Sequence, residues 1–369
     1  MPSTIPFEIV AEGFVSRRPE TGPTSFAGGA RCAWTPRGDL VCTFMVQSQL
    51  GVNDFKPMLA RSADGGITWR EPGFIWPDLV ASYSIFGSIG RGSDGELLFF
   101  GARYPIDQPG EPNWCEATQG LKQNELIWAS SADGGTSWSD PRPIPMPFPG
   151  SAEQTSPISV ARDGAWHACY SPYNTFDPRV KPERNQVVLL TSHDRGRTWR
   201  HTAMLRWSDP LSTAAEAWVV ELADGRLLGT CWNLNQRDGS DLPNAYAVSA
   251  DGGMTWSPTR STGILGQSTG LCPLPDGRAL FIYNQRKHGE LGVWLAAVRP
   301  TAADFGIEWN HILWRAATPG TGTSGHSDWT NFAFGEPSIT LLSDGSLLAV
   351  WWCAGENGRG IRYCKLRGR

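Results

Sequence analysis

Three glutamates precede glycine turns by similar distances, and carboxylates in such positions suit acid/base or nucleophilic chemistry. Glu216 stands before the turn glycine Gly225, and Glu336 has the same offset from Gly345. Glu153 lies two residues further from its own turn glycine. If these side chains face a common axis, burial would favour proton transfer at neutral pH, and two of them would act as a pair. The alternative is a structural role, in which each glutamate bonds to backbone groups or to an arginine.

Aromatic, amide and cationic residues follow the predicted strand ends and nearby loops, where they would line the same cleft. The candidates for substrate binding are Arg103, Trp232, Asn233, Gln285, Arg286, His326, Trp329 and Trp352. Sugars need polar partners for their hydroxyl groups and flat apolar surfaces for their C–H faces, so this composition is typical of a carbohydrate site. Arg103 and Arg286 could bind an anionic group through the planar guanidinium fork, or form salt bridges to the glutamates.

The elements that must position these residues are visible as a repeat. Four versions of Ser-x-Asp-x-Gly-x-x-Trp occur, at residues 62–69, 131–138, 192–199 and 249–256. The aspartate can accept backbone N–H bonds in a tight turn, and the indole five residues later can wedge between adjacent sheets. We interpret each copy as a turn clamp rather than as a catalytic or metal site. A repeat with this spacing is typical of a propeller or solenoid.

A second repeat gives the number of sheets. Turn pairs followed by apolar strand residues occur at Arg37-Gly38, Asp94-Gly95, Asp163-Gly164, Asp224-Gly225, Asp276-Gly277 and Asp344-Gly345. These hairpins alternate with the boxes, including a degenerate fifth box at 302–309, so each unit predicts four antiparallel strands. We therefore predict an all-β, six-bladed β-propeller that forms a single domain over 1–369. The sixth unit lacks a fourth strand, and residues 7–10 would supply it and close the ring.

Composition narrows the partners and the compartment. The net charge is only −4 and no basic run occurs, which argues against nucleic acid or an anionic membrane as partner. No leader precedes Phe7 and no apolar span has membrane length, so we expect a soluble, cytoplasmic protein. The eight cysteines have no C-x-x-C spacing, and Cys32 and Cys42 face each other across the first hairpin, where they would pair only if oxidised. No metal-ligand cluster or phosphate-binding glycine loop occurs, so we expect neither a metal nor a cofactor.

The boxes and hairpins together resemble the sialidase (neuraminidase) superfamily of six-bladed Asp-box, or BNR-repeat, propellers, and the resemblance covers essentially the whole chain. The segment 216–225 looks like the fourth-blade segment that carries the family's catalytic glutamate, which this resemblance places at Glu216. Asp54, ahead of the first box, lies in the region where those enzymes keep an acid/base aspartate. The motifs are specific for the fold and only weakly specific for the activity.

The chain departs from that family at its substrate-binding residues. The positions that match the three carboxylate-binding arginines and the nucleophilic tyrosine hold, or lie near, Gly28, Trp232, Leu242 and Ser268. Arg31 or Arg103 would replace the arginines only in part. Cleavage of sialic acid is therefore not expected. The similar exo-acting arabinanase-type propellers use two glutamates from neighbouring blades, and Glu153 with Glu216 would suit that plan.

The sequence thus predicts a sialidase-like glycoside hydrolase that acts on a neutral or weakly acidic glycan or oligosaccharide through a carboxylate pair. Glu216 would act with Glu153 or Glu336. A polysaccharide lyase on the same propeller and a non-catalytic carbohydrate-binding propeller are the alternatives. In the lyase, Arg103 or Arg286 would neutralise a uronate while Tyr83, Tyr173 or His326 abstracts a proton.

Overall fold

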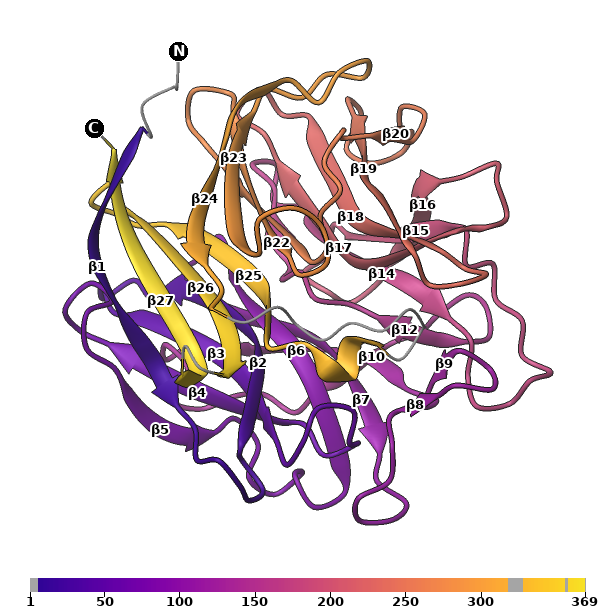
Figure 1. Ribbon diagram of the computed structural model, residues 1–369, viewed down its shortest axis with the longest axis horizontal. Coiled ribbons are helices and arrows are strands. Elements are labelled where there is room, and N and C mark those ends of the chain that lie inside the picture. The colour runs from indigo at the N-terminus through magenta and orange to yellow at the C-terminus, as the bar shows by residue number, and fades with distance from the viewer. Residues whose placement is uncertain (1–5, 318–327, 356–357, 369) are drawn as a thin grey trace.

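The computed structural model describes residues 6–317, 328–355 and 358–368, and within them the chain forms six antiparallel blades around a central axis (Figure 1). The predicted six-bladed β-propeller is therefore confirmed. The described helical structure is a single 3-10 turn, η1 (Asp328–Asn331). No helix among these residues is long and apolar enough to cross a membrane.

The blades are numbered along the chain, and their strands are given from the axis outward. Blade 1 consists of β2 (Phe26–Trp34), β3 (Leu40–Gln47), β4 (Lys56–Ser62) and β5 (Arg70–Phe74). Blade 2 consists of β6 (Tyr83–Arg91), β7 (Leu97–Pro105), β10 (Glu125–Ser131) and β11 (Arg142–Ile144). Blade 3 has a divided inner strand, and consists of β12 (Ser151–Glu153), β13 (Ser159–Val160), β14 (Trp166–Tyr173), β15 (Gln186–Ser192) and β16 (Arg200–Arg206).

The second half of the ring continues in the same order. Blade 4 consists of β17 (Ser212–Glu221), β18 (Leu227–Asn235), β19 (Asp241–Ser249) and β20 (Arg260–Ser261). Blade 5 consists of β21 (Thr269–Pro273), β22 (Ala279–Gln285), β23 (Gly292–Val298) and β24 (Ile307–Arg315). Blade 6 consists of β25 (Phe334–Leu341), β26 (Leu347–Gly355), β27 (Gly358–Gly368) and β1 (Phe7–Arg17). A short ribbon, β8 (Trp114–Cys115) with β9 (Gly120–Leu121), projects from blade 2.

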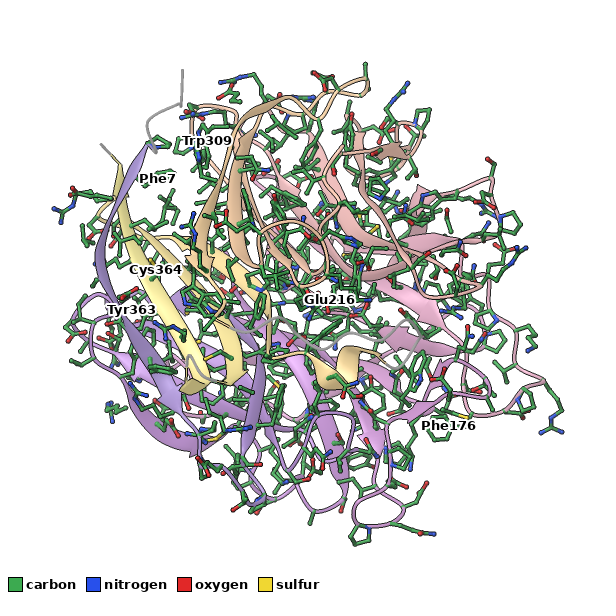
Figure 2. The ribbon with its side chains drawn as sticks, viewed as in Figure 1. Phe7, Phe176, Glu216, Trp309, Tyr363 and Cys364 are labelled. Atoms are coloured by element: carbon green, nitrogen blue, oxygen red, sulfur yellow. The ribbon has the colours of Figure 1, made fainter. Side chains whose placement is uncertain are left out.

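The N-terminal strand closes the ring, as predicted. Strand β1 pairs with β27 from Phe7 opposite Gly368 to Arg17 opposite Gly360, so it is longer than the expected residues 7–10. The ring of Phe7 also packs edge-on against Trp309 of blade 5, at 5.4 Å between ring centres (Figure 2). Because the last sheet is built from both ends of the propeller, closure leaves few free strand edges.

The four intact boxes are turn clamps, which confirms their interpretation from sequence. In blade 2 the Ser131 hydroxyl donates to Asp133 Oδ1 at 2.8 Å and accepts the Gly135 N–H at 2.8 Å. Asp133 also accepts N–H bonds from Thr136 and Ser137 and an O–H bond from Ser137 at 2.6 Å. In the degenerate fifth box, the Asp304 carboxylate accepts one N–H bond, from Gly306, and Thr301 holds the rest of the turn.

The core is divided into clusters that lie between successive blades. Val41 and Leu59 of blade 1, for example, join Phe99 and Ile127 of blade 2 in one buried cluster. The other interfaces contain equivalent clusters, including the one between blades 6 and 1 that completes the ring. Each sheet therefore buries both faces against its neighbours.

Seven of the eight cysteines are buried in these clusters as apolar residues, and Cys115 in β8 is the exception. Cys32 lies directly opposite Cys42 in blade 1, as expected, and both thiols are free and buried. A hydrogen bond with Cys42, together with burial, raises the pKa of Cys32 well above its usual value.

The clamp in blade 2 can be tested by removing its carboxylate. We expect Asp133→Ala to lower the free energy of unfolding by about 1–3 kcal/mol, because the turn loses several hydrogen bonds at once. The nearby exposed Asp140, changed to Ala, is the matched control and should alter stability much less. Chemical denaturation of the three proteins measures the difference, and equal stability of the two variants would contradict the clamp.

Candidate active site

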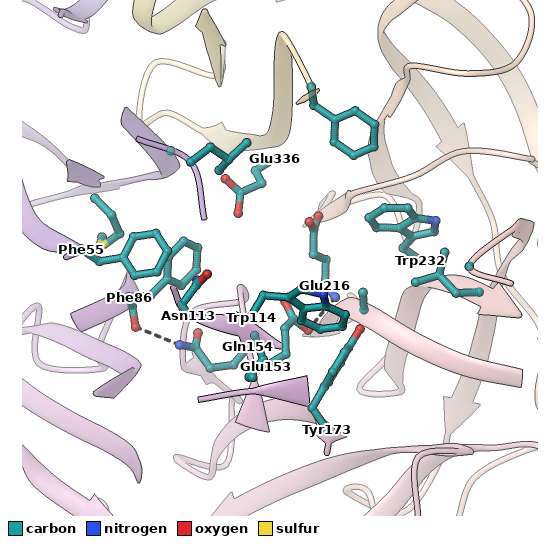
Figure 3. A pocket seen from close by; sticks show the side chains of 18 of the residues that line it. Phe55, Phe86, Asn113, Trp114, Glu153, Gln154, Tyr173, Glu216, Trp232 and Glu336 are labelled. Carbon is teal, nitrogen blue, oxygen red and sulfur yellow. Dashed lines mark hydrogen bonds between the residues drawn. The ribbon is translucent and has the colours of Figure 1, made fainter. Parts of the chain in front are cut away.

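A cavity of about 220 Å³ opens at the centre of the ring, and all six blades contribute to its wall (Figure 3). The three predicted glutamates, Glu153, Glu216 and Glu336, lie together in this wall. Apolar and aromatic residues make up much of the remainder, including Phe26, Phe55, Phe86, Trp114, Tyr173, Trp232, Phe332 and Trp352. The arrangement combines acidic groups with flat apolar surfaces in one concave space.

Two of the glutamates occupy unusual backbone positions. Glu216 and Glu336 have φ values of 50° and 48°, in the left-handed region that L-residues rarely adopt. Each sits in a β-bulge of its inner strand, between Ala215 and Trp218 in blade 4 and between Gly335 and Ser338 in blade 6. A bulge re-aims a side chain relative to the regular ladder. The local backbone thus turns both carboxylates toward the axis.

Two of the three carboxylates, those of Glu153 and Glu336, also hold the bulge of the following blade. Glu153 Oε2 of blade 3 accepts the backbone N–H of Glu216 at 2.8 Å. Glu336 Oε2 of blade 6 accepts the backbone N–H of Gly29 in blade 1, also at 2.8 Å. Gly29, with φ of 63°, lies in the equivalent bulge of that blade. A Cβ atom on Gly28 would come within 3.0 Å of Glu336 Oε2, so glycine makes room for this carboxylate.

Burial makes the three carboxyl groups unusually weak acids. It raises the pKa of Glu153 to about 8, with repulsion from Glu216 as the next cause. It raises the pKa of Glu216 to about 7, where repulsion from Glu336 adds to the effect and attraction to Arg286 opposes it. The pKa of Glu336 is also raised by burial, against the attraction of Arg31 and the Gly29 N–H bond. Glu216 Oε2 is buried and finds no hydrogen-bond partner among the described residues.

Two buried arginines lie close to these glutamates. Arg31 donates to the backbone carbonyls of Ala30, Thr155 and Glu336, so its guanidinium is committed to the ring itself. Arg286 lines the cavity 3.6 Å from the Phe332 ring centre, and its Nε bonds Gln267 Oε1 at 3.0 Å. Burial lowers the pKa of Arg286 to about 10, which leaves it charged at neutral pH.

A buried aspartate that the sequence analysis missed orients one wall of the cavity. The Asp241 carboxylate has no exposed surface and accepts bonds from Trp232 Nε1 at 3.0 Å and Gln267 Nε2 at 3.1 Å. His288 Nε2 lies 2.9 Å from the same carboxylate. Asp241 therefore fixes the Trp232 indole and, through Gln267, the Arg286 guanidinium. Asp241 stands at the start of β19, paired with Leu234 of the adjacent strand β18, and no local sequence pattern marks it as a residue of the site.

Comparison with known families identifies the chain. A model described as a BNR repeat-like domain matches residues 113–348, which is more than half of the chain. The protein belongs to this family. No curated protein matched. The expected resemblance to sialidase-superfamily propellers is thus confirmed at the level of family and fold.

Solved structures agree on the fold. A protein of unknown function from Dyadobacter fermentans is similar with a TM-score of 0.76 and 19% identity, over 100% of both chains. An α-L-arabinofuranosidase from Fusarium graminearum has a TM-score of 0.68 and 14% identity, over 97% of this chain and 98% of its own. The NanB sialidase from Streptococcus pneumoniae has a TM-score of 0.65 and 15% identity, over 100% of this chain and 71% of its own. At these identities the likeness shows the fold alone.

Within this BNR repeat-like propeller, some predicted binding residues reach the cavity and others do not. Trp232, Arg286 and Trp352 line it. Arg103, Asn233 and Gln285 are not among the lining residues. His326 lies outside the described residues, and Trp329 is described only as part of η1.

The remaining polar candidates have partners away from the cavity. Arg103 pairs at 2.8 Å with Glu125, its cross-strand neighbour in blade 2. Asn233 Nδ2 contacts the Pro243 carbonyl at 3.4 Å. Asp54 accepts the Ser48 N–H at 3.2 Å, lies 3.7 Å from Lys56 Nζ, and does not line the cavity.

The raised pKa of Glu153 predicts a specific dependence of stability on pH. The folded protein holds a proton on this group up to about pH 8, whereas the unfolded chain releases it near the ordinary value of 4.5. The contribution of protonated Glu153 to the free energy of unfolding is therefore fully present below about pH 4.5 and is lost as the pH rises through about 8. Glu153→Gln keeps an acceptor for the Glu216 N–H but does not titrate. At pH 9 we therefore expect its free energy of unfolding to exceed that of wild type by on the order of a few kcal/mol.

Chemical denaturation at pH 5, 7 and 9 measures this difference. The advantage of Glu153→Gln should shrink toward pH 5. The control is Glu125→Gln, because the Glu125 side chain is 59% exposed and pairs with Arg103 on the surface. A stability difference for Glu153→Gln that does not vary with pH would show that the group is not buried in its neutral form.

Proposed function

We propose that this protein is a glycoside hydrolase that cleaves a neutral or weakly acidic glycan with Glu153 and Glu216 as its essential carboxylates. The observation that carries the proposal is that these two half-buried residues touch in the wall of a cavity rich in aromatic side chains, where Glu153 Oε2 accepts the backbone N–H of Glu216 at 2.8 Å. Similar propellers include an α-L-arabinofuranosidase and a sialidase, which supports glycoside chemistry on this scaffold.

The two carboxyl groups suit different roles because their pKa values differ. Glu153, with a pKa raised to about 8, is the proton donor to the leaving oxygen. Since its Oε2 already accepts the Glu216 N–H, the acidic proton belongs on the other oxygen, where a substrate can receive it. Glu216, with a pKa of about 7, is the ionised partner that acts as base or nucleophile.

Glu336 and the aromatic walls would bind rather than react. Repulsion from Glu336 is the main cause, after burial, of the raised pKa of Glu216. The carboxylate of Glu336 is also placed to accept a substrate hydroxyl, while Trp232 and Phe332 offer flat surfaces to the C–H face of a sugar ring.

The structure gives reasons to prefer hydrolysis over the other functions considered. A lyase that used Tyr173 as its base would need a phenol that ionises readily, but burial raises the pKa of Tyr173 well above its usual value. A site that only binds sugar would be favoured if the glutamates were engaged by arginines, yet neither Glu153 nor Glu216 forms an ion pair with a described side chain. Sialic acid cleavage is not proposed, because Gly28 and Trp232 stand where arginines would be needed.

The catalytic role of Glu216 can be tested with a neutral isostere. We expect Glu216→Gln to lower kcat by about 10²–10⁴-fold, the usual contribution of a positioned acid or base, with little change in fold. The control is Glu221→Gln, in the same strand, because Glu221 pairs with Arg162 at the far end of the blade. Hydrolysis is measured on a panel of aryl glycosides and arabino-oligosaccharides. Full turnover by Glu216→Gln on the best substrate would defeat the assignment.

The proposed roles also predict the pH profile. Activity requires ionised Glu216 and protonated Glu153, so kcat/KM should rise as the pH passes about 7 and fall as it passes about 8. The narrow optimum belongs to the coupled pair rather than to either group alone. In Glu336→Gln, which removes a repelling charge, the rising limb should move to lower pH. A profile in Glu336→Gln that coincides with wild type would contradict the electrostatic role of Glu336.

A further inference from the structure

Arg184, a cation in the cavity wall, forms no ion pair with any carboxylate that the structure describes. Arg184, in the connection from β14 to β15, lines the cavity and is only 7% exposed. Among the described side chains no aspartate or glutamate forms an ion pair with it. The pKa values of the other two buried arginines, Arg31 and Arg286, are supported by attraction to Glu336 and Glu216. For Arg184, whose pKa is lowered by burial, Tyr173 is the one described group that raises the pKa.

The guanidinium of Arg184 is held in place rather than loosely buried. It lies 4.7 Å from the centre of the Tyr173 ring and also contacts the Tyr173 hydroxyl. The Thr213 hydroxyl fixes the backbone by donating to the Arg184 carbonyl at 3.0 Å. Arg184 Nε is buried and has no hydrogen-bond partner among the described residues. Burying a charge without a counter-ion costs free energy, so binding an anion next to the Arg184 guanidinium would stabilise it.

This cation lies beside the proposed catalytic pair. Tyr173 stands opposite Ser151 on the adjacent strand, and Glu153 stands opposite Ser171, so Tyr173 and Glu153 are diagonal neighbours on one face of the sheet. The Tyr173 hydroxyl is near enough to Glu153 and Glu216 to feel both charges. A sugar ring whose glycosidic bond meets Glu153 and Glu216 would therefore direct a substituent toward Tyr173 and Arg184.

We infer that Arg184 and Tyr173 form a subsite for a carboxylate, and that the natural substrate is a glycan carrying a uronic acid at the cleaved position. A planar carboxylate matches the guanidinium fork and would supply the counter-ion that Arg184 lacks. This inference rests on the proposed glycoside hydrolase function and names its substrate class. It uses a residue of blade 3, apart from the positions where a sialidase-like arginine triad is expected.

The test compares matched sugars in a binding measurement. Isothermal titration calorimetry with D-glucuronate and D-galacturonate, with glucose and galactose, and with the 6-sulfates of glucose and galactose gives the affinities for wild type, Arg184→Met and Arg184→Lys. We expect wild type to bind a uronate at least about ten-fold more tightly than its neutral counterpart, the usual scale of a charge-assisted contact. In Arg184→Met this preference should vanish, while the affinity for the neutral sugar changes less than about two-fold. Arg184→Lys should retain part of it.

A matched control and a stability measurement separate binding from folding. Arg179 lies in the same connection, is 88% exposed at its side chain and pairs with Asp177, so Arg179→Met should behave as wild type. Removing an uncompensated buried charge should raise the melting temperature of Arg184→Met, whereas loss of a structural contact would lower it. A lower melting temperature together with an unchanged uronate preference would overturn the inference.

The remaining outcomes distinguish this inference from the proposed function. Equal affinity for uronates and neutral sugars, or no binding of any of them, overturns the subsite. Tighter binding of the 6-sulfates overturns the choice of a carboxylate. Uronate binding that depends on Arg184, without hydrolysis of any uronide, supports the subsite and contradicts the hydrolase. An unsaturated product that absorbs in the ultraviolet would likewise support the subsite and replace hydrolysis by elimination.

Discussion

The inner strands of the six blades converge on one axis, and backbone N–H groups that face this axis must find acceptors there. In blades 1 and 4 a bulge turns Gly29 and Glu216 into left-handed geometry and points their N–H groups out of the regular ladder. The acceptors are the carboxylates of the preceding blades, Glu336 and Glu153. A buried N–H without a partner would cost about 1–3 kcal/mol. The acidic groups of the cavity are thus part of the hydrogen bonding that holds adjacent blades in register.

This double use explains why weak acids can persist at the centre of a packed ring. A carboxyl group that accepts an N–H bond is satisfied in its neutral form as well as in its ionised form. Burial can therefore raise the pKa of Glu153 to about 8 without leaving its Oε2 atom unbonded. Two buried arginines attract the glutamates that are ionised. Arg31 is held by bonds to three backbone carbonyls, and Arg286 is held by a bond to Gln267.

The parts of the structure that follow local rules could be predicted from the sequence. The boxes depend on contacts within four residues, as between Ser131 and Gly135. Glu216 and Glu336 stand at equal distances before their hairpin glycines, and both line the cavity. Asp241 and Arg184 were missed because their roles depend on contacts between strands or across loops. Of the predicted neighbours Trp232 and Asn233 only Trp232 lines the cavity, because successive side chains of a strand point to opposite faces.

The ring is symmetric in its backbone and asymmetric in its chemistry. Blades 1, 4 and 6 carry the same bulge, but the left-handed position holds glycine in blade 1 and glutamate in the other two. At Gly29 a Cβ atom would meet the Phe86 ring at 2.9 Å, so blade 1 cannot place a third carboxylate there without moving an aromatic wall. Glu336 therefore caps a bulge that bears no acid, whereas Glu153 caps one that does. The junction of blades 3 and 4 is thus where one acidic residue bonds the backbone of another, and Arg184, which forms no ion pair with a described carboxylate, lies at the same junction.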